Sequence, residues 1–124
     1  MNQRYGIAQS INQMNKSPVS FTKLHIRVRY ETAFGQDLWL LGSPEWLGSW
    51  NGNANGGKGG MQMTWTEGHL WIAEIPYQKV LQLGLDQSFE FKFMVKFNNR
   101  QNGTYNVIRW EGGNNNHKFS GRHI

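Results

Sequence analysis

The chain is organised around one stretch: Gly35-Gln36-Asp37-Leu38-Trp39-Leu40-Leu41-Gly42-Ser43-Pro44-Glu45-Trp46-Leu47-Gly48-Ser49-Trp50. A turn glycine leads into a short apolar run that ends at Gly42-Ser43-Pro44. Such a run between turn residues predicts a strand over 37–41, with Trp39 packed in a core. Trp50 stands at the start of 51–57, where no apolar side chain is larger than alanine. An indole beside so polar a segment has few apolar neighbours, so we expect Trp50 to be exposed and to take part in recognition.

Working outward, alternation of apolar and polar residues predicts the other strands. It is clearest over 88–97, where one face carries Phe89, Phe91, Phe93, Val95 and Phe97 and the other Glu90, Lys92, Met94 and Lys96. We expect the phenylalanine face to lie in the core. The same period over 21–30 places Lys23, Arg27 and Arg29 on a solvated face.

Shorter strands are expected over 61–65, 70–75, 105–111 and 117–121, with turn residues between them. A long Gly/Asn loop is expected over 48–60 and an irregular connection over 77–87, and no segment predicts a convincing helix. Seven to eight short strands of this kind predict an all-β fold, an antiparallel β-sandwich or a small barrel.

Length and composition limit the range of possible folds and functions. A chain of 124 residues suits one domain, here 20–124, preceded by a polar extension or linker over 1–19. There is no cysteine, and the four histidines lack metal-ligand spacing, so we expect no metal and no cofactor. No run reaches the ~18 apolar residues that a membrane span needs. No signal segment is visible in the first 20 residues, which leaves the compartment open and slightly favours an intracellular one.

Trp50, Trp71 and Trp110 are the tryptophans expected at the surface. Trp110 ends a strand before Glu111-Gly112-Gly113 and an asparagine run. A flat indole face suits the C–H-rich face of a sugar ring, and neighbouring lysine and asparagine side chains can bond to its hydroxyls. A nucleic-acid base is the alternative partner for such a face, and ordinary packing is the third explanation.

At these residues the sequence resembles the starch-binding domains, the family 20 carbohydrate-binding modules. The resemblance spans residues 20–121 and rests on motifs that occur in the family's order: 34–50, Leu70-Trp71-Ile72-Ala73-Glu74-Ile75-Pro76, Phe89-Glu90-Phe91-Lys92-Phe93, and Trp110-Glu111-Gly112-Gly113 with Asn116-His117-Lys118-Phe119. It implies an immunoglobulin-like sandwich that binds α-1,4-glucans such as starch, glycogen or maltodextrins without catalysis. It also implies attachment to, or partnership with, an enzyme that acts on these polymers.

The resemblance further implies two sugar sites. The first would consist of Trp50, Lys92, Trp110, Glu111 and Asn116, with Asn115 as the alternative to Asn116 because the asparagine run allows a shift of one residue. The second would consist of Trp71, Phe34 in place of a tyrosine, and Trp65 as the nearest aromatic to a further tyrosine of the family.

Three other functions remain as alternatives. A glycoside hydrolase needs a carboxylate pair across a cleft, and the eight acidic residues suggest no such pair. A single-stranded nucleic-acid-binding barrel would need basic residues beside the exposed aromatics, whereas Lys23, Arg27 and Arg29 are distant in sequence from Trp50 and Trp110. A family 48 glycogen-binding module of a kinase regulatory subunit is the third, and the spacing of 47–50 favours family 20 over it.

Overall fold

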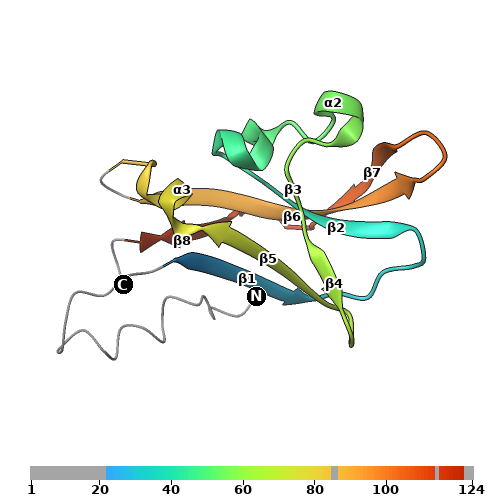
Figure 1. Ribbon diagram of the computed structural model, residues 1–124, viewed down its shortest axis with the longest axis horizontal. Coiled ribbons are helices and arrows are strands. Elements are labelled where there is room, and N and C mark those ends of the chain that lie inside the picture. The colour runs from blue at the N-terminus through green and yellow to red at the C-terminus, as the bar shows by residue number, and fades with distance from the viewer. Residues whose placement is uncertain (1–21, 85–86, 114, 122–124) are drawn as a thin grey trace.

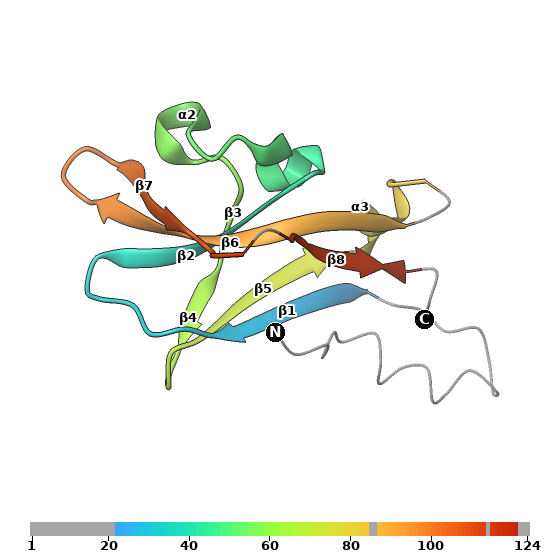
Figure 2. The same cartoon turned by 180° about the vertical axis from the view of Figure 1, so that it is seen from behind.

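A computed structural model describes residues 22–84, 87–113 and 115–121, and these form two antiparallel sheets packed face to face (Figures 1 and 2). The expected extension over 1–19 lies outside the described residues. The strands are β1 (Lys23–Arg29), β2 (Gln36–Gly42), β3 (Met61–Gln62), β4 (Thr64–Thr66), β5 (Leu70–Pro76), β6 (Ser88–Asn99), β7 (Thr104–Trp110) and β8 (His117–Ser120). The short helical segments are η2 (Glu45–Trp50), α2 (Ala54–Gly57) and α3 (Tyr77–Leu81).

One sheet has the order β1-β5-β4 and the other β3-β2-β6-β7, with β8 paired to a further part of β6. The long strand β6 is therefore the centre of the five-stranded sheet, since β2, β7 and β8 all pair with it. This arrangement confirms the all-β sandwich and excludes the small barrel for the described residues. The strand predicted over 61–65 is divided, because β3 joins the five-stranded sheet and β4 joins the three-stranded one.

The main core lies between the sheets and confirms most of the expected phenylalanine ladder. Phe89, Phe91, Phe93 and Val95 are buried there beside Leu24 and Ile26 of β1 and Ile75 of β5. Phe97 was also expected in the core, and this prediction is wrong, because its side chain is exposed. The pairing of β6 with β7 shifts register between Val95 and Lys96, and beyond this bulge the Phe97 ring lies against Gly35, which offers no side chain to cover it.

A second, smaller core lies on the outer face of the five-stranded sheet. Trp39, Leu41 and Met94 are buried there, with Tyr105 and Val107 packed against them. The expectation that Trp39 is a packing residue is confirmed, although it packs outside the sandwich and not between the sheets. Segment 43–60 covers this face and holds η2 and α2, which lie above the sheet on the side away from β1 and β5 (Figure 1).

Two expectations about connections were therefore wrong. Segment 48–60 holds the end of η2 and all of α2 and forms a compact cover, and the connection over 77–87 begins with α3. Proline explains the second case, because Pro76 fixes its own φ at −56° and leads directly into the first helical position. The second core explains the compact cover. Trp39, Leu41 and Met94 form an apolar surface on the sheet, and a polar segment can bury that surface with its backbone.

Candidate functional site

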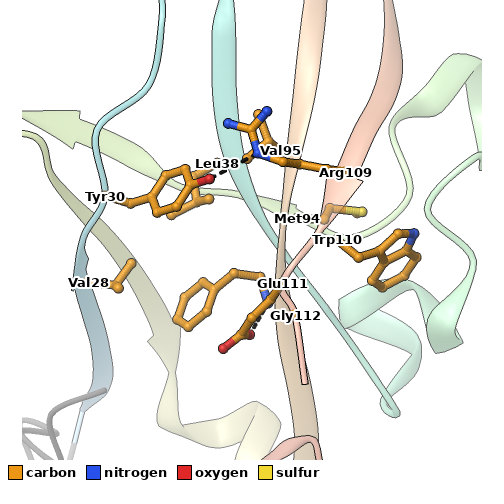
Figure 3. A pocket seen from close by; sticks show the side chains of 10 residues that line it. Val28, Tyr30, Leu38, Met94, Val95, Arg109, Trp110, Glu111 and Gly112 are labelled. Atoms are coloured by element: carbon orange, nitrogen blue, oxygen red, sulfur yellow. Dashed lines mark hydrogen bonds between the residues drawn. The ribbon is translucent and has the colours of Figure 1, made fainter. Parts of the chain in front are cut away.

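The outer face of the five-stranded sheet brings several of the expected sugar-binding residues together. Trp110 of β7 lies directly opposite Met94 of β6 in the antiparallel ladder, so the two side chains share a face. Glu90 and Lys92 lie on the same face, because they precede Met94 by four and two residues along β6. Trp110 is 46% exposed and Lys92 is half-buried. Figure 3 shows the Trp110 indole beside Met94, on the side of β6 away from Val28 and Tyr30.

Trp50 belongs to segment 43–60, which covers this face, and its backbone has an unusual shape. Gly48, Ser49 and Trp50 have consecutive positive φ angles of 87°, 48° and 64°. A positive φ is uncommon for a side chain as large as tryptophan and persists only where the surroundings hold it. The Asn51 amide donates to the Gly48 carbonyl at 2.9 Å and closes the turn. The result is an indole that is 38% exposed, as the sequence predicted for Trp50.

Met94 lies between Trp110 and the segment that carries Trp50. It lies opposite Trp110, and its Sδ and Cε atoms lie 3.1 and 3.0 Å from the position that a Gly52 Cβ would occupy. The chain therefore touches Met94 only two residues after Trp50. Sequence analysis placed Met94 on the correct face of β6 but gave it no function. The alternation that put Lys92 on that face was the signal that could have identified it.

Lys92 and Asn116 organise the polar side of this face. The Lys92 ammonium donates to the Gly113 carbonyl at 2.9 Å and so ties the loop that follows β7 to β6. The side-chain amide of Asn116 donates through Nδ2 to Glu90 Oε1 at 2.8 Å. Asn115 is exposed next to it. Glu90 is a second residue that sequence analysis did not single out, and it holds Asn116 beside the strand that carries Lys92.

Glu111 uses both carboxylate oxygens within the protein. Oε1 accepts a hydrogen bond from the Phe93 amide at 3.1 Å, and Oε2 lies 2.6 Å from His117 Nε2. The Glu111 amide donates in turn to the Phe93 carbonyl at 2.9 Å. These contacts fix the end of β7 just after Trp110. In this structure Glu111 therefore holds the backbone of the site, with His117 as its partner, and a hydroxyl of a ligand would have to share its lone pairs.

A cavity of about 460 Å³ opens between β1 and β7, behind this face (Figure 3). Its lining residues are mostly apolar and are Val28, Tyr30, Leu38, Phe93, Met94, Val95, Arg109, Trp110, Glu111 and Gly112. Arg109 Nε donates to the Tyr30 hydroxyl at 3.0 Å across its mouth. Glu111 is the one acidic residue in this lining, whereas glycoside hydrolysis uses a pair of carboxylate side chains.

The expected second site is only partly at the surface. Trp71 was expected to be exposed, and this was wrong, because it is 2% exposed and belongs to the main core. Its Nε1 donates to the Tyr30 carbonyl at 3.0 Å, so its polar atom is satisfied inside the protein. Trp65, opposite Trp71 on the edge strand β4, is 49% exposed, and Phe34 is almost fully exposed with Arg100 over its ring. Phe34 and Trp65 thus remain available for contacts, and Trp71 does not.

Other kinds of site were sought in the same part of the chain. Within residues 22–84, 87–113 and 115–121, no group of three or more histidine, aspartate or glutamate side chains is placed to hold a metal ion. The described helices are all too short or too polar to cross a membrane.

Partly exposed tryptophans, such as Trp50 and Trp110 here, are typical of a binding surface. The sequence model of the starch-binding domain family matches residues 21–122, and the chain therefore belongs to this family of carbohydrate-binding modules. Its fold is similar to part of a family 15 glycoside hydrolase, the glucoamylase from Hypocrea jecorina, with a TM-score of 0.56 and 21% sequence identity. That match covers 82% of this chain and 15% of the glucoamylase. No curated protein sequence matches this chain.

Proposed function

We propose that the outer face of the five-stranded sheet binds α-1,4-glucans, with Trp50 and Trp110 as the stacking residues. The observation that supports this most is that both indoles, which lie sixty residues apart in the sequence, are partly exposed, while Met94 lies opposite Trp110 and touches Gly52, two residues after Trp50. Lys92 and Asn116, with Asn115 as the alternative to Asn116, would bond to sugar hydroxyls around them. Glu111 would act chiefly by fixing the end of β7.

The proposed mechanism is stacking without a chemical step. By analogy with bases on aromatic rings, each indole would contribute roughly 1–3 kcal/mol. With a few hydrogen bonds that mostly replace bonds to water, the net binding free energy would be about −5 to −7 kcal/mol, a Kd of about 10–200 μM. Affinity of this size lets a module hold an attached or partner enzyme near a polymer and still release it. Phe34 and Trp65 would supply a second, weaker contact to polymer.

The charge distribution supports a glucan over a nucleic acid. The basic residues of β1 belong to the three-stranded sheet, on the other side of the sandwich from Trp50 and Trp110. Lys23 is paired with Glu74 at 3.3 Å, and Arg29 Nη1 donates to the Gly68 carbonyl at 2.8 Å. A nucleic acid stacked on the two tryptophans would therefore not lie along these cations.

Adsorption to granular starch at several salt concentrations tests this function. We expect the protein to bind starch, to be released by soluble maltoheptaose, and to change affinity less than about twofold between 50 and 500 mM NaCl, because a neutral sugar releases no counterions. Single-stranded DNA of about ten nucleotides is the comparison ligand. Absence of starch adsorption, together with DNA binding that falls steeply with salt, would reverse the assignment in favour of the nucleic-acid-binding alternative.

A further inference from the structure

The most unusual group on the outer face is Lys96, which the alternation over 88–97 placed on the face opposite the phenylalanines. It does lie on that face, but it is fully buried beneath segment 51–60. Its ammonium donates hydrogen bonds to the carbonyls of Gly52 at 2.9 Å, Gly59 at 2.8 Å and Gly57. An ammonium has three N–H donors and no acceptor, so these three carbonyls match its capacity.

The surroundings of Lys96 fit a cation that is held in place. The ammonium lies 3.8 Å from the centre of the Trp39 ring, a distance suited to a cation–π contact. Asp37 is its cross-strand neighbour on β2, and the Asp37 carboxylate accepts hydrogen bonds from Gln62 and Asn98. Burial lowers the pKa of Lys96 to about 8, so the ammonium form still predominates at pH 7.

Two of the three glycines have no room for a side chain. A Cβ on Gly57 would lie 1.8 Å from the Tyr105 carbonyl oxygen, and one on Gly59 would lie 1.9 Å from the Asn51 carbonyl oxygen. The backbone of segment 51–60 is thus pressed against β7 and against itself, with three carbonyls directed at one point. Without a donor at that point these oxygens would be buried without hydrogen-bond partners, which is unfavourable.

We propose that Lys96 is a positioning residue for the glucan site: its three hydrogen bonds hold segment 51–60 closed on the sheet and so fix the orientation of Trp50. Gly52 is only two residues from Trp50, and the hydrogen bond from the Asn51 amide to the Gly48 carbonyl closes the backbone turn that contains Trp50. Trp50 is therefore held between a closed turn and an anchored carbonyl. This inference rests on the proposed function for the binding readout, but not for the anchoring of the segment.

The main test replaces the anchor and measures both properties. Lys96→Met keeps an unbranched side chain that is only one atom shorter and removes all three donors. We expect amide hydrogen exchange over 51–60 to accelerate at least tenfold, with exchange in β1 and β5 unchanged, and β-cyclodextrin affinity to fall at least fivefold. Lys58→Met, in the same segment but exposed, is the matched control and should change neither quantity.

Chemical rescue separates the effect of the hydrogen-bond donors of Lys96 from the effect of its side-chain packing. Because the chain has no cysteine, Lys96→Cys introduces a single thiol that can be alkylated in the unfolded protein before refolding. Alkylation with bromoethylamine restores an ammonium at nearly the original length, and we expect it to restore slow exchange over 51–60 and binding. Alkylation with iodoethane adds a similar apolar tail without donors and should restore neither.

A variant on the other side of the contact keeps the proposal testable if the Lys96 variants do not fold. Gly59→Ala places a methyl group against the Asn51 carbonyl and displaces the segment while Lys96 stays intact. We expect the same pattern of fast exchange over 51–60 and weakened binding. Unchanged exchange in Lys96→Met, or wild-type binding in a Lys96→Met protein that exchanges fast, would overturn the proposal. A wild-type protein that binds no glucan would instead refute the proposed function and leave the exchange test of the anchor intact.

Discussion

Trp50→Ala and Trp110→Ala will each weaken binding of β-cyclodextrin about 10- to 100-fold. Each variant removes one stacking face, worth roughly 1–3 kcal/mol, and every 1.4 kcal/mol changes the dissociation constant tenfold. Both side chains are half-exposed, so their loss should lower the free energy of unfolding by less than about 1 kcal/mol. Calorimetric titration and thermal unfolding of the same preparations measure the two quantities.

The matched control for this prediction is Trp65→Ala, at an exposed tryptophan on the other sheet. We expect it to leave β-cyclodextrin binding within twofold of wild type, because β4 does not contribute to the outer face of the five-stranded sheet. Wild-type binding by both the Trp50 and Trp110 variants would show that the sugar lies elsewhere. A loss of binding in the Trp65 variant alone would move the main site to the surface that carries Phe34 and Trp65.

Trp71→Ala will lower the free energy of unfolding by about 3–5 kcal/mol, the largest stability effect that we expect from a single tryptophan. The side chain is 2% exposed in the main core, and its removal leaves a cavity that the two sheets cannot close. It also leaves the Tyr30 carbonyl without the indole donor. Denaturant unfolding followed by circular dichroism measures the change.

Trp65→Ala again serves as the control, since Trp65 lies directly opposite Trp71 in the ladder of β4 and β5. Its effect on the free energy of unfolding should stay below about 1 kcal/mol, because half of its surface is already exposed. Equal destabilisation by the two variants would mean that Trp71 is not the core residue that the structure describes. At temperatures where Trp71→Ala remains folded, we expect it to bind β-cyclodextrin within about threefold of wild type.

The strands of the sandwich could be predicted because their signal is local. Alternation over 21–30 and 88–97 follows from the geometry of a strand with one buried face, and β1 and β6 occupy those segments. Phe97 obeys the same period and pairs with Gln36 in an unbroken ladder with β2, but it is exposed because its ring lies against Gly35, where no side chain covers it. The sequence of β6 alone does not show which of its positions lack a covering neighbour.

The site could be predicted only in part, for a similar reason. Trp50 and Trp110 were recognisable because each stands next to polar residues along the chain. Trp71 stands between Leu70 and Ile72, and its environment is set by β1, which lies about 40 residues earlier and is followed by Tyr30, whose carbonyl accepts the indole hydrogen bond. The burial of Lys96 could not be predicted for the same reason. The three carbonyls that bind it belong to glycines of a segment whose composition predicted an open loop.

We propose above that the indoles of Trp50 and Trp110 bind α-glucan chains in preference to β-glucan chains. Calorimetric titration of the wild-type protein with β-cyclodextrin, maltoheptaose and cellohexaose, under one set of conditions, tests it most directly. We expect the two α-glucans to bind with a Kd of about 10–200 μM and cellohexaose to give no measurable heat. Binding of cellohexaose as tight as that of maltoheptaose, or no binding of either α-glucan, would contradict the account.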